Sequence, residues 1–262
     1  MSGLTVLVTG ATEGVGYETA RLMATGERTV IVHARTERRG EETLARLVSA
    51  GVDPARLRLA VADFTSLTEV ATMAKLVADE HPRVDVLINN ACTAGENLRV
   101  LTEDGHEATF QVNYLAHYLL TAMLEEQLSH RARIVNVSST MHRGANLHWL
   151  DLGRSQRYSQ SAAYAQSKLA LTMFTSALPE FGPPGVTAVS VQPGSHVYCA
   201  EGRPLRECAA VMAGICTKDV VNGGYYNERL RETQPAPAVV DRRSVERLWR
   251  MSSELAGLGA TM

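Results

Sequence analysis

Two side chains that can share a proton, Tyr164 and Lys168, stand four residues apart. If this segment is helical, both lie on one face, so the ammonium group sits near the phenol. A nearby cation favours the phenolate and lowers the pKa of the tyrosine toward working pH, which suits a general acid or base. Ser138 and Ser139, at the end of an apolar run, offer a hydroxyl to the oxygen that gains or loses the proton. The set predicts proton transfer at a substrate oxygen.

A glycine-rich turn follows the first apolar run, where residues 9–16 read TGATEGVG. Glycines in such a turn let the backbone approach a pyrophosphate, whose charge then meets the N-terminus of the next helix. The spacing is G-x-x-x-G-x-G rather than G-x-G-x-x-G, and a plain structural turn would look similar. Asn89, Asn90 and Ala91 after another apolar run, then Asn113 in an amphipathic segment, favour nucleotide binding.

The elements that must position these residues alternate along the chain. Short, almost continuous apolar runs predict strands of a parallel sheet, and the longer segments between them have helical periodicity. This alternation is typical of a doubly wound α/β fold, here with about seven strands, the last near residues 223–227. The other expected strands are 5–8, 29–33, 57–61, 84–89, 133–138 and 186–191, and the expected helices are 17–24, 38–49, 67–80, 103–128, 162–178 and 242–255.

The alternation stops after Gly194, where a less patterned region with three of the four cysteines begins. We expect one domain, with a dinucleotide-binding core at 1–194, a substrate lid at 195–240 and a C-terminal helix at 241–262. The lid is expected over the end of the sheet, because ligands of such folds bind outside the carboxyl ends of the strands.

Composition excludes several classes of protein. Apolar residues make up 45% of the chain and charged residues 21%, with a net charge of −2, so neither disorder nor a nucleic-acid partner is expected. No apolar run reaches membrane-spanning length, and no secretion signal is evident, so we expect a cytoplasmic protein. Cys92, Cys199, Cys208 and Cys216, even with His196 nearby, match no metal-ligand spacing, so no metal site is expected. Many Ala, Arg and Val residues suggest a bacterial source.

Taken in order, the glycine-rich turn, Asn-Asn-Ala, Asn113, Ser139, Tyr-x-x-x-Lys and Pro193-Gly194 resemble the short-chain dehydrogenase/reductase family over essentially the whole chain. The chain looks most like the branch of retinol dehydrogenases and WW-domain oxidoreductases. The strings that carry this likeness are FQVNYLAHYLLTAML (110–124), IVNVSSTMHRGANLHWLDL (134–152) and AYAQSKLALTMF (163–174). The resemblance implies a Rossmann-type fold and an oxidoreductase acting on CH–OH or C=O groups.

The resemblance also implies the catalytic roles. Tyr164 is the general acid or base, and Lys168 lowers its pKa while binding the nicotinamide ribose. Ser139 orients the substrate oxygen, and is preferred over Ser138 because the family's catalytic serine is usually the second of such a pair. Asn113 anchors a water molecule that relays protons through Lys168.

A nicotinamide dinucleotide site follows from the same resemblance. Asp63 is expected to hold the adenine amino group, and Asn90 and Ala91 to flank the adenosine ribose. The full expected set is Gly10, Thr12, Glu13, Gly14, Val15, Gly16, Arg35, Thr36, Asp63, Phe64, Asn90, Ala91, Tyr164, Lys168, Pro193, Gly194 and Ser195.

The expected cofactor is NADP(H). An acidic residue at the end of the second strand would hydrogen-bond the ribose 2′-hydroxyl and repel a 2′-phosphate. This chain has His33-Ala34-Arg35-Thr36 there, and Arg35 can form charge-assisted bonds to the phosphate. Arg39, one helical turn on, can help, whereas Glu13 in the glycine turn works against this preference.

Two positions depart from the family pattern. Cys92 stands where Asn-Asn-Ala is normally followed by Gly, and we expect a buried, inert thiol that crowds the cofactor loop. After Pro193-Gly194, where the family often has Thr a few residues on, the chain reads SHVYC at 195–199. Ser195 is expected to take over part of the threonine's role.

The expected reaction is NADPH-dependent reduction of a ketone or aldehyde on a bulky apolar or aromatic molecule, for example as a natural-product tailoring ketoreductase. Two alternatives stay open: an NADP-dependent alcohol dehydrogenase of retinol or steroid type, and a catalytically silent dinucleotide-binding regulator. A homodimer or homotetramer is possible. The residues expected to wall the substrate pocket are Val197, Tyr198, Leu205, Val211, Met212 and Ile215.

Overall fold

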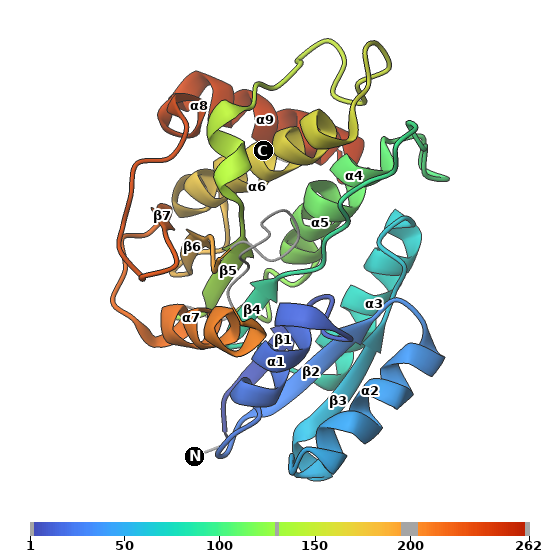
Figure 1. Cartoon of the computed structure of the whole chain (residues 1–262), viewed down its shortest axis with the longest axis vertical. Helices are drawn as coiled ribbons and strands as arrows, with labels where there is room; N and C mark the ends of the chain where they lie inside the picture. Colours follow the sequence, from blue (N-terminus) through green and yellow to red (C-terminus); the bar gives the residue numbers. More distant parts are fainter. Residues whose placement is uncertain (1–2, 129–130, 195–203, 260–262) are drawn as a thin grey trace.

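A computed structural model describes residues 3–128, 131–194 and 204–259 of the chain. Within these ranges seven strands form one entirely parallel sheet, in the order β3-β2-β1-β4-β5-β6-β7 (Figure 1). The order reverses direction between β1 and β4, so the sheet is doubly wound as predicted. The strands are β1 (Thr5–Val8), β2 (Thr29–Ala34), β3 (Leu57–Val61), β4 (Val86–Asn89), β5 (Arg133–Val137), β6 (Thr187–Val191) and β7 (Gly224–Tyr226).

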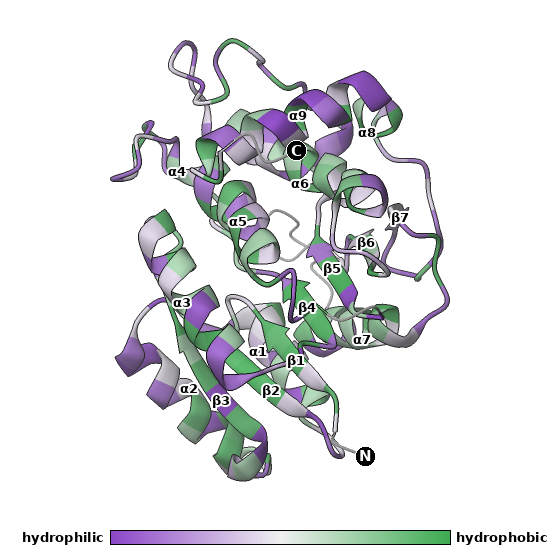
Figure 2. Cartoon of the chain, turned by 180° about the vertical axis from the view of Figure 1, so that it is seen from behind, coloured by the Kyte–Doolittle hydropathy of each residue, from purple (hydrophilic) through white to green (hydrophobic). Residues whose placement is uncertain are grey.

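Helices cover both faces of the sheet because alternate strand residues point to opposite sides. Val6 and Val8 of β1 pack toward α1 (Gly14–Met23), α2 (Glu37–Ser49) and α7 (Leu205–Thr217). Leu7, between them, packs into the other core layer, under three further helices. These are α3 (Leu67–Glu80), α5 (Ala116–Met123) and α6 (Gln160–Phe181), and α8 (Pro237–Val240) and α9 (Arg242–Leu255) pack on α6. Figure 2 shows the central strands mainly in green, with purple segments on α2 and α9.

The long helix expected at 103–128 is divided into three pieces: α4 (Ala108–Phe110), a π-helical turn η2 (Gln111–Leu115) and α5. Glu107 is the N-cap that starts α4, since its carboxylate accepts hydrogen bonds from the backbone N–H groups of Thr109 and Phe110, at 2.9 and 2.7 Å. The residues before it therefore lie outside the helix. The π turn contains Asn113, and such turns often occur at functional sites.

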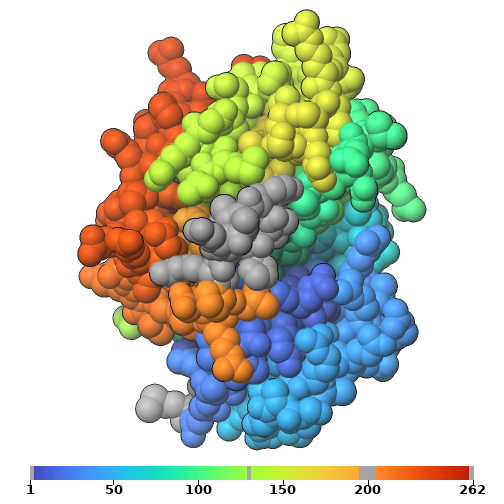
Figure 3. All heavy atoms as spheres, in the orientation of Figure 1, coloured from blue at the N-terminus to red at the C-terminus, as the bar shows by residue number. Residues whose placement is uncertain are grey.

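The expected lid is partly wrong. From Leu205 to Thr217 the chain forms α7, which packs against α1 on one face of the sheet rather than over its end. In Figure 3 the orange atoms of α7 lie beside the deep-blue atoms of the N-terminal segment. Met212 and Ile215 are fully buried in the core with the strands, so they do not wall a substrate pocket as expected. Val211 is also buried there and lines a separate cavity beside Glu228 and Leu230. The seventh strand, β7, lies within the predicted range. Residues 195–203, including the expected wall residues Val197 and Tyr198, lie outside the described residues.

No helix in the described ranges is both long and apolar enough to cross a membrane. Two short 3₁₀ segments, η1 (Pro54–Arg56) and η3 (Thr140–Gly144), complete the described secondary structure. Of these, η3 matters for the site because it follows β5 directly and packs against α6.

Candidate active site

The glycine-rich turn joins β1 to α1 and lies against the loop after β4. Gly10 has a φ of +61°, and a Cβ there would lie 2.7 Å from the Cα of Ala91. A Cβ on Gly16 would lie 2.2 Å from the Gly10 carbonyl oxygen. Only glycine fits these two positions, so the turn can approach Asn90 and Ala91 closely. Thr9 fastens the two loops, because its hydroxyl oxygen accepts from both backbone N–H groups of Asn90 and Ala91, at 2.8 and 2.9 Å.

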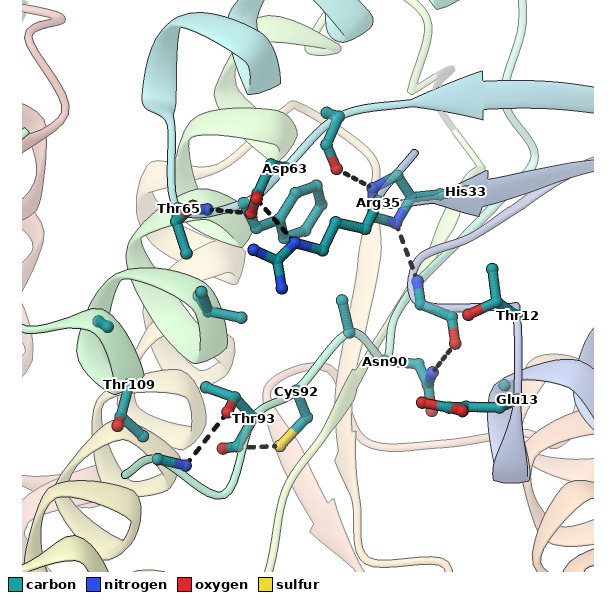
Figure 4. A pocket seen from close by; sticks show the side chains of 18 of the residues that line it. Thr12, Glu13, His33, Arg35, Asp63, Thr65, Asn90, Cys92, Thr93 and Thr109 are labelled. Carbon is teal, nitrogen blue, oxygen red and sulfur yellow. Dashed lines mark hydrogen bonds and ion pairs between the residues drawn. The ribbon is translucent and has the colours of Figure 1, made fainter. Parts of the chain in front are cut away.

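This turn forms one wall of a cavity of about 630 Å³ at the carboxyl ends of β1 to β4 (Figure 4). Gly14, Val15 and Gly16 bring the N-terminus of α1 to the cavity, and the N-cap residue Glu13 makes no side-chain cap bond to it. Open backbone N–H groups at a helix N-terminus attract phosphate. Eleven of the expected cofactor residues line the cavity: Gly10, Thr12, Glu13, Gly14, Val15, Gly16, Arg35, Asp63, Phe64, Asn90 and Ala91. The residues present therefore fit the adenosine diphosphate half of a dinucleotide.

Two ion pairs lie at one edge of this cavity. Arg35 Nε lies 2.7 Å from Asp63 Oδ2, and Arg39 pairs with Glu13 at 3.1 Å. Burial raises the pKa of Asp63, but its bonds with Thr65 and the Arg35 guanidinium outweigh that effect, so its pKa lies below the ordinary value. Both expected phosphate ligands, Arg35 and Arg39, thus stand at the same edge of the cavity.

Lys168 and Tyr164 lie on one face of α6, as the four-residue spacing predicts. The Lys168 Nζ is 5.6 Å from the centre of the Tyr164 ring and donates a hydrogen bond of 2.9 Å to the Val137 carbonyl oxygen. Lys168 is buried, whereas Tyr164 is half-buried. The bond to Val137 fastens α6 to the end of β5, two residues before Ser139.

The two serines after β5 differ in their surroundings. Ser138 is buried, and its hydroxyl bonds to Thr172 at 2.7 Å within the core. Ser139 is half-buried and is the N-cap of η3, where its oxygen accepts from Met141 N at 3.3 Å. Because that oxygen is the acceptor, the hydroxyl proton of Ser139 is available to a substrate oxygen. This difference favours Ser139 over Ser138.

Asn113 is fully buried in the π turn. Its side chain accepts from Thr93 N at 2.7 Å and donates to Thr93 O and Ser167 Oγ, at 2.9 and 3.0 Å. The Asn113 carbonyl oxygen lies 3.2 Å from Nδ1 of His117. Asn113 thus joins the loop after β4 to α6, near Lys168.

Other expected residues lie elsewhere. Thr36 caps α2, accepting from Arg39 N at 3.4 Å, and does not line the cavity. Pro193 and Gly194 follow β6, also outside the cavity lining, and Ser195 lies outside the described residues. The catalytic set Asn113, Ser139, Tyr164 and Lys168 is likewise separate from the residues lining this cavity.

Cys92 corrects an expectation. Its thiol is exposed and lines the cavity rather than being buried in the core, because the loop after β4 turns the side chain toward the open space. Cys208 and Cys216, on α7, are buried. Within residues 3–128, 131–194 and 204–259, no group of three or more His, Cys, Asp or Glu side chains could hold a metal ion. His196 and Cys199 lie outside these ranges.

Several cavity residues were missed from the sequence. His33 and Thr65 flank expected residues at the ends of β2 and β3, so proximity to Arg35 and Asp63 was a usable signal. Val112 comes from the π turn and Tyr158 from the segment before α6, and their approach to the cavity depends on tertiary packing alone. No local pattern could have identified them.

A family model described as short chain dehydrogenase matches residues 4–197. The chain belongs to this family. The match runs from β1 through β6, and so includes the glycine-rich turn, Ser139, Tyr164 and Lys168. A short-chain dehydrogenase is an oxidoreductase that acts on alcohol or carbonyl groups, and members of the family use NAD(P)(H).

Curated relatives confirm the expected branch of short-chain dehydrogenases. Retinol dehydrogenase 13 of Mus musculus is 33% identical over 285 residues, which cover 98% of this chain and 84% of the relative. WW domain-containing oxidoreductase of Gallus gallus is 35% identical over 209 residues, covering 76% of this chain and 50% of the relative.

Solved structures of similar sequence have the same fold. A crystal structure of an uncharacterized protein from Mycobacterium Paratuberculosis has a TM-score of 0.78 and 30% identity, covering 97% of this chain and 93% of that one. A metagenomic short-chain oxidoreductase in complex with NADP has a TM-score of 0.63 and 28% identity, covering 85% and 96%.

Proposed function

We propose that this short-chain dehydrogenase reduces a ketone or aldehyde on a bulky apolar or aromatic small molecule with NADPH. The observation that supports this most directly is the bond from Lys168 Nζ to Val137 O. It fastens the helix that carries Tyr164 and Lys168 to the strand end that leads into Ser139. A proton donor and a hydroxyl that can orient the carbonyl oxygen therefore share one end of the sheet.

Each residue of the set has a defined task in this proposal. NADPH, when bound, supplies the hydride that reaches the carbonyl carbon. The Ser139 hydroxyl donates a hydrogen bond to the carbonyl oxygen and orients it. The Tyr164 phenol gives its proton to the same oxygen, so the C=O group becomes an alcohol, and Lys168 stabilises the phenolate that is left. The role of Asn113, to anchor a water molecule through which the proton of Tyr164 is replaced, comes from the family resemblance alone, because its side-chain amide is bonded to Thr93 and Ser167.

The preference for NADP(H) rests on Arg35. Its side chain is 65% exposed at the cavity edge, and its bond to Asp63 uses Nε. The two terminal nitrogen atoms of the guanidinium can then form charge-assisted bonds to a 2′-phosphate. The NADP complex of the metagenomic relative is consistent with this preference.

The substrate class rests on relatives. The names retinol dehydrogenase 13 and polyprenol dehydrogenase describe relatives that act on lipophilic alcohols. These names equally favour a second candidate, in which the same residues oxidise an alcohol of retinol or steroid type and Tyr164 accepts the proton. A tailoring role in bacterial secondary metabolism, a cytoplasmic location and a dimeric or tetrameric assembly stay part of the proposal, on composition and resemblance alone.

A carbonyl panel tests the proposal, with NADPH consumption followed by absorbance. We expect turnover of polycyclic or long-chain ketones and aldehydes, and little turnover of small charged keto acids. Turnover of the keto acids alone would overturn the substrate class. Faster oxidation of retinol or a steroid alcohol with NADP⁺ would support the second candidate, and NADPH binding without any turnover would indicate a silent regulator.

A further inference from the structure

His33 is a buried titratable side chain with no place in the proposed reaction. It stands near the carboxyl end of β2, is 3% exposed and contributes to the wall of the 630 Å³ cavity. Its ring lies between two other segments of the chain (Figure 4). The Gly10 N–H donates to Nδ1 at 2.9 Å, and Nε2 lies 3.0 Å from the Ala62 carbonyl oxygen.

These two bonds fix the protonation of the ring. Because a backbone N–H can only donate, Nδ1 must carry the lone pair. The proton of the neutral ring is then on Nε2, which donates to Ala62. Burial lowers the pKa of His33 to about 4, so the ring keeps this form at neutral pH.

The bonded segments are those that present the cofactor ligands. Gly10 begins the glycine-rich turn, and the Ala11 N–H also bonds to the backbone oxygen of His33, at 3.0 Å. Ala62 directly precedes Asp63 and Phe64, and the Phe64 ring stacks on the imidazole with centres 4.4 Å apart. His33 thus sets the distance between the turn expected to meet the pyrophosphate and the strand end expected to hold adenine.

We propose that His33 is a positioning residue of the dinucleotide site, which sets affinity for the adenosine diphosphate half of the cofactor without touching the hydride or the 2′-phosphate. The proposal rests on the cofactor site proposed above. The proposal predicts that loss of the imidazole weakens the binding of NADPH and of NADH to the same extent, because both cofactors contain the adenosine diphosphate half. Loss of Arg35, by contrast, is expected to weaken the binding of NADPH only.

Three substitutions separate the interactions of the ring. His33→Phe keeps the stacking on Phe64 and loses both hydrogen bonds. His33→Asn can keep an acceptor near Gly10 N, and His33→Gln can keep a donor near Ala62 O. Leaving a buried donor or acceptor unpaired weakens binding by about tenfold or more. We therefore expect His33→Phe to raise the Kd of both cofactors by about tenfold, and the other two to raise it less.

The experiment is titration of intrinsic and cofactor fluorescence with NADPH and NADH, at a temperature where each variant is folded by circular dichroism. His148→Phe, at an exposed histidine outside the cavity, is the matched control and should bind as the wild type does. Two-dimensional ¹H–¹⁵N spectra of the wild type should show the His33 ring protonated at Nε2 only. This measurement holds even if His33→Phe does not fold.

Folded His33 variants with unchanged Kd for both cofactors would overturn the inference, and a purely structural role would lower the unfolding temperature alone. A ring protonated at Nδ1 would also overturn it. A wild type that binds neither NADPH nor NADH would instead overturn the proposed function, and the inference with it.

Discussion

At the scale of single residues, two ion pairs determine the charge at the edge of the cavity where the proposed site would hold adenosine. Arg35 and Asp63 are paired at 2.7 Å, and Arg39 and Glu13 at 3.1 Å. Each guanidinium therefore already has one carboxylate partner: Arg35 bonds through Nε and keeps both terminal nitrogen atoms for a 2′-phosphate, whereas Arg39 uses a terminal nitrogen for Glu13. In the proposed NADPH site, the carboxylates that would repel the phosphate are therefore expected to matter as much for cofactor preference as the arginines that would attract it.

Arg35→Ala should lower kcat/KM for NADPH while leaving kcat/KM for NADH close to the wild-type value. A hydrogen bond to a charged group contributes enough to change affinity roughly 10- to 100-fold. The comparison of kcat/KM for the two cofactors measures this. An equal loss with both cofactors would mean that Arg35 holds Asp63 in place rather than a phosphate.

Glu13→Gln should act in the opposite direction. The substitution removes a negative charge from the turn and frees Arg39, so the preference for NADPH over NADH should rise several-fold, on the order of the effect of one surface charge. The rise should shrink at high ionic strength, because salt screens exposed charges. A preference that does not change would show that Glu13 lies too far from the phosphate to matter.

Tyr164→Phe should nearly abolish turnover and leave the Kd for cofactor close to normal. In the proposed mechanism the phenol serves only the proton transfer, whereas the glycine-rich turn, Asp63 and Lys168 are expected to hold the cofactor. General acid–base catalysis contributes about 10²- to 10⁴-fold, so kcat should fall at least that far. If most of the rate persisted, the proton would come from another donor, such as water.

At the scale of elements, the turn η3 shows how a short segment is held in place. His142 is fully buried, its Nδ1 lies 2.7 Å from the Ser139 carbonyl oxygen, and its Nε2 accepts from Ala236 N at 3.2 Å. Since Ala236 N donates, the ring proton is on Nδ1, and burial lowers the pKa of His142. The neutral ring joins the serine turn to the segment after β7.

His142→Phe should lower kcat by about tenfold, because the Ser139 turn loses a buried bond that orients it. The Kd for NADPH should not change, since η3 lies outside the cofactor cavity. His142→Asn, which can keep a donor near Ser139 O, should recover part of the rate. An unchanged kcat, or a Kd that rises with it, would contradict this role.

The sequence predicts an element well when neighbouring residues determine it, and poorly when packing against distant segments determines it. All seven strands were predicted to within two residues at each end, because a strand buried on both faces is a continuous apolar run. The start of α1 at Gly14 was missed, since glycines obscure helical periodicity, and α7 was taken for lid because a less patterned region surrounds it. In both cases packing, rather than propensity, decides the structure.

The residues of the candidate site likewise fall into those that local spacing predicts and those that depend on distant segments. Tyr164 and Lys168 are positioned by one helix, so their spacing alone predicted their common face. The exposure of Cys92 and the contacts of His33 depend on segments far apart in sequence, which spacing cannot reveal.

At the scale of the whole molecule, neutral buried imidazoles make stability depend on pH. Burial lowers the pKa of His33 to about 4 and that of His117 to about 3, and it also lowers that of His142. In the unfolded chain a histidine titrates near 6.5. Below that pH the unfolded chain therefore binds protons that the folded chain does not.

We expect the free energy of unfolding to be constant above about pH 6.5 and to fall below it, by up to about 1.4 kcal/mol per pH unit for each such histidine. Urea titrations at neutral and mildly acidic pH measure this fall. In a variant at His33, the free energy of unfolding should fall less steeply with decreasing pH. In a variant at the exposed His148, it should fall as steeply as in the wild type. A stability that stays level from neutral pH to pH about 5 would contradict the buried neutral state.

The docking of α7 on α1 has a consequence for how the molecule is made. The ribosome releases β1, the glycine-rich turn and α1 long before Leu205–Thr217 is synthesised. Until then the nascent chain exposes the apolar surface that Met212 and Ile215 later cover. Such a surface is a target for chaperones and a risk for aggregation. An earlier segment of the chain therefore depends on a later one, and the glycine-rich turn and α1 gain their final packing only after α7 has been synthesised.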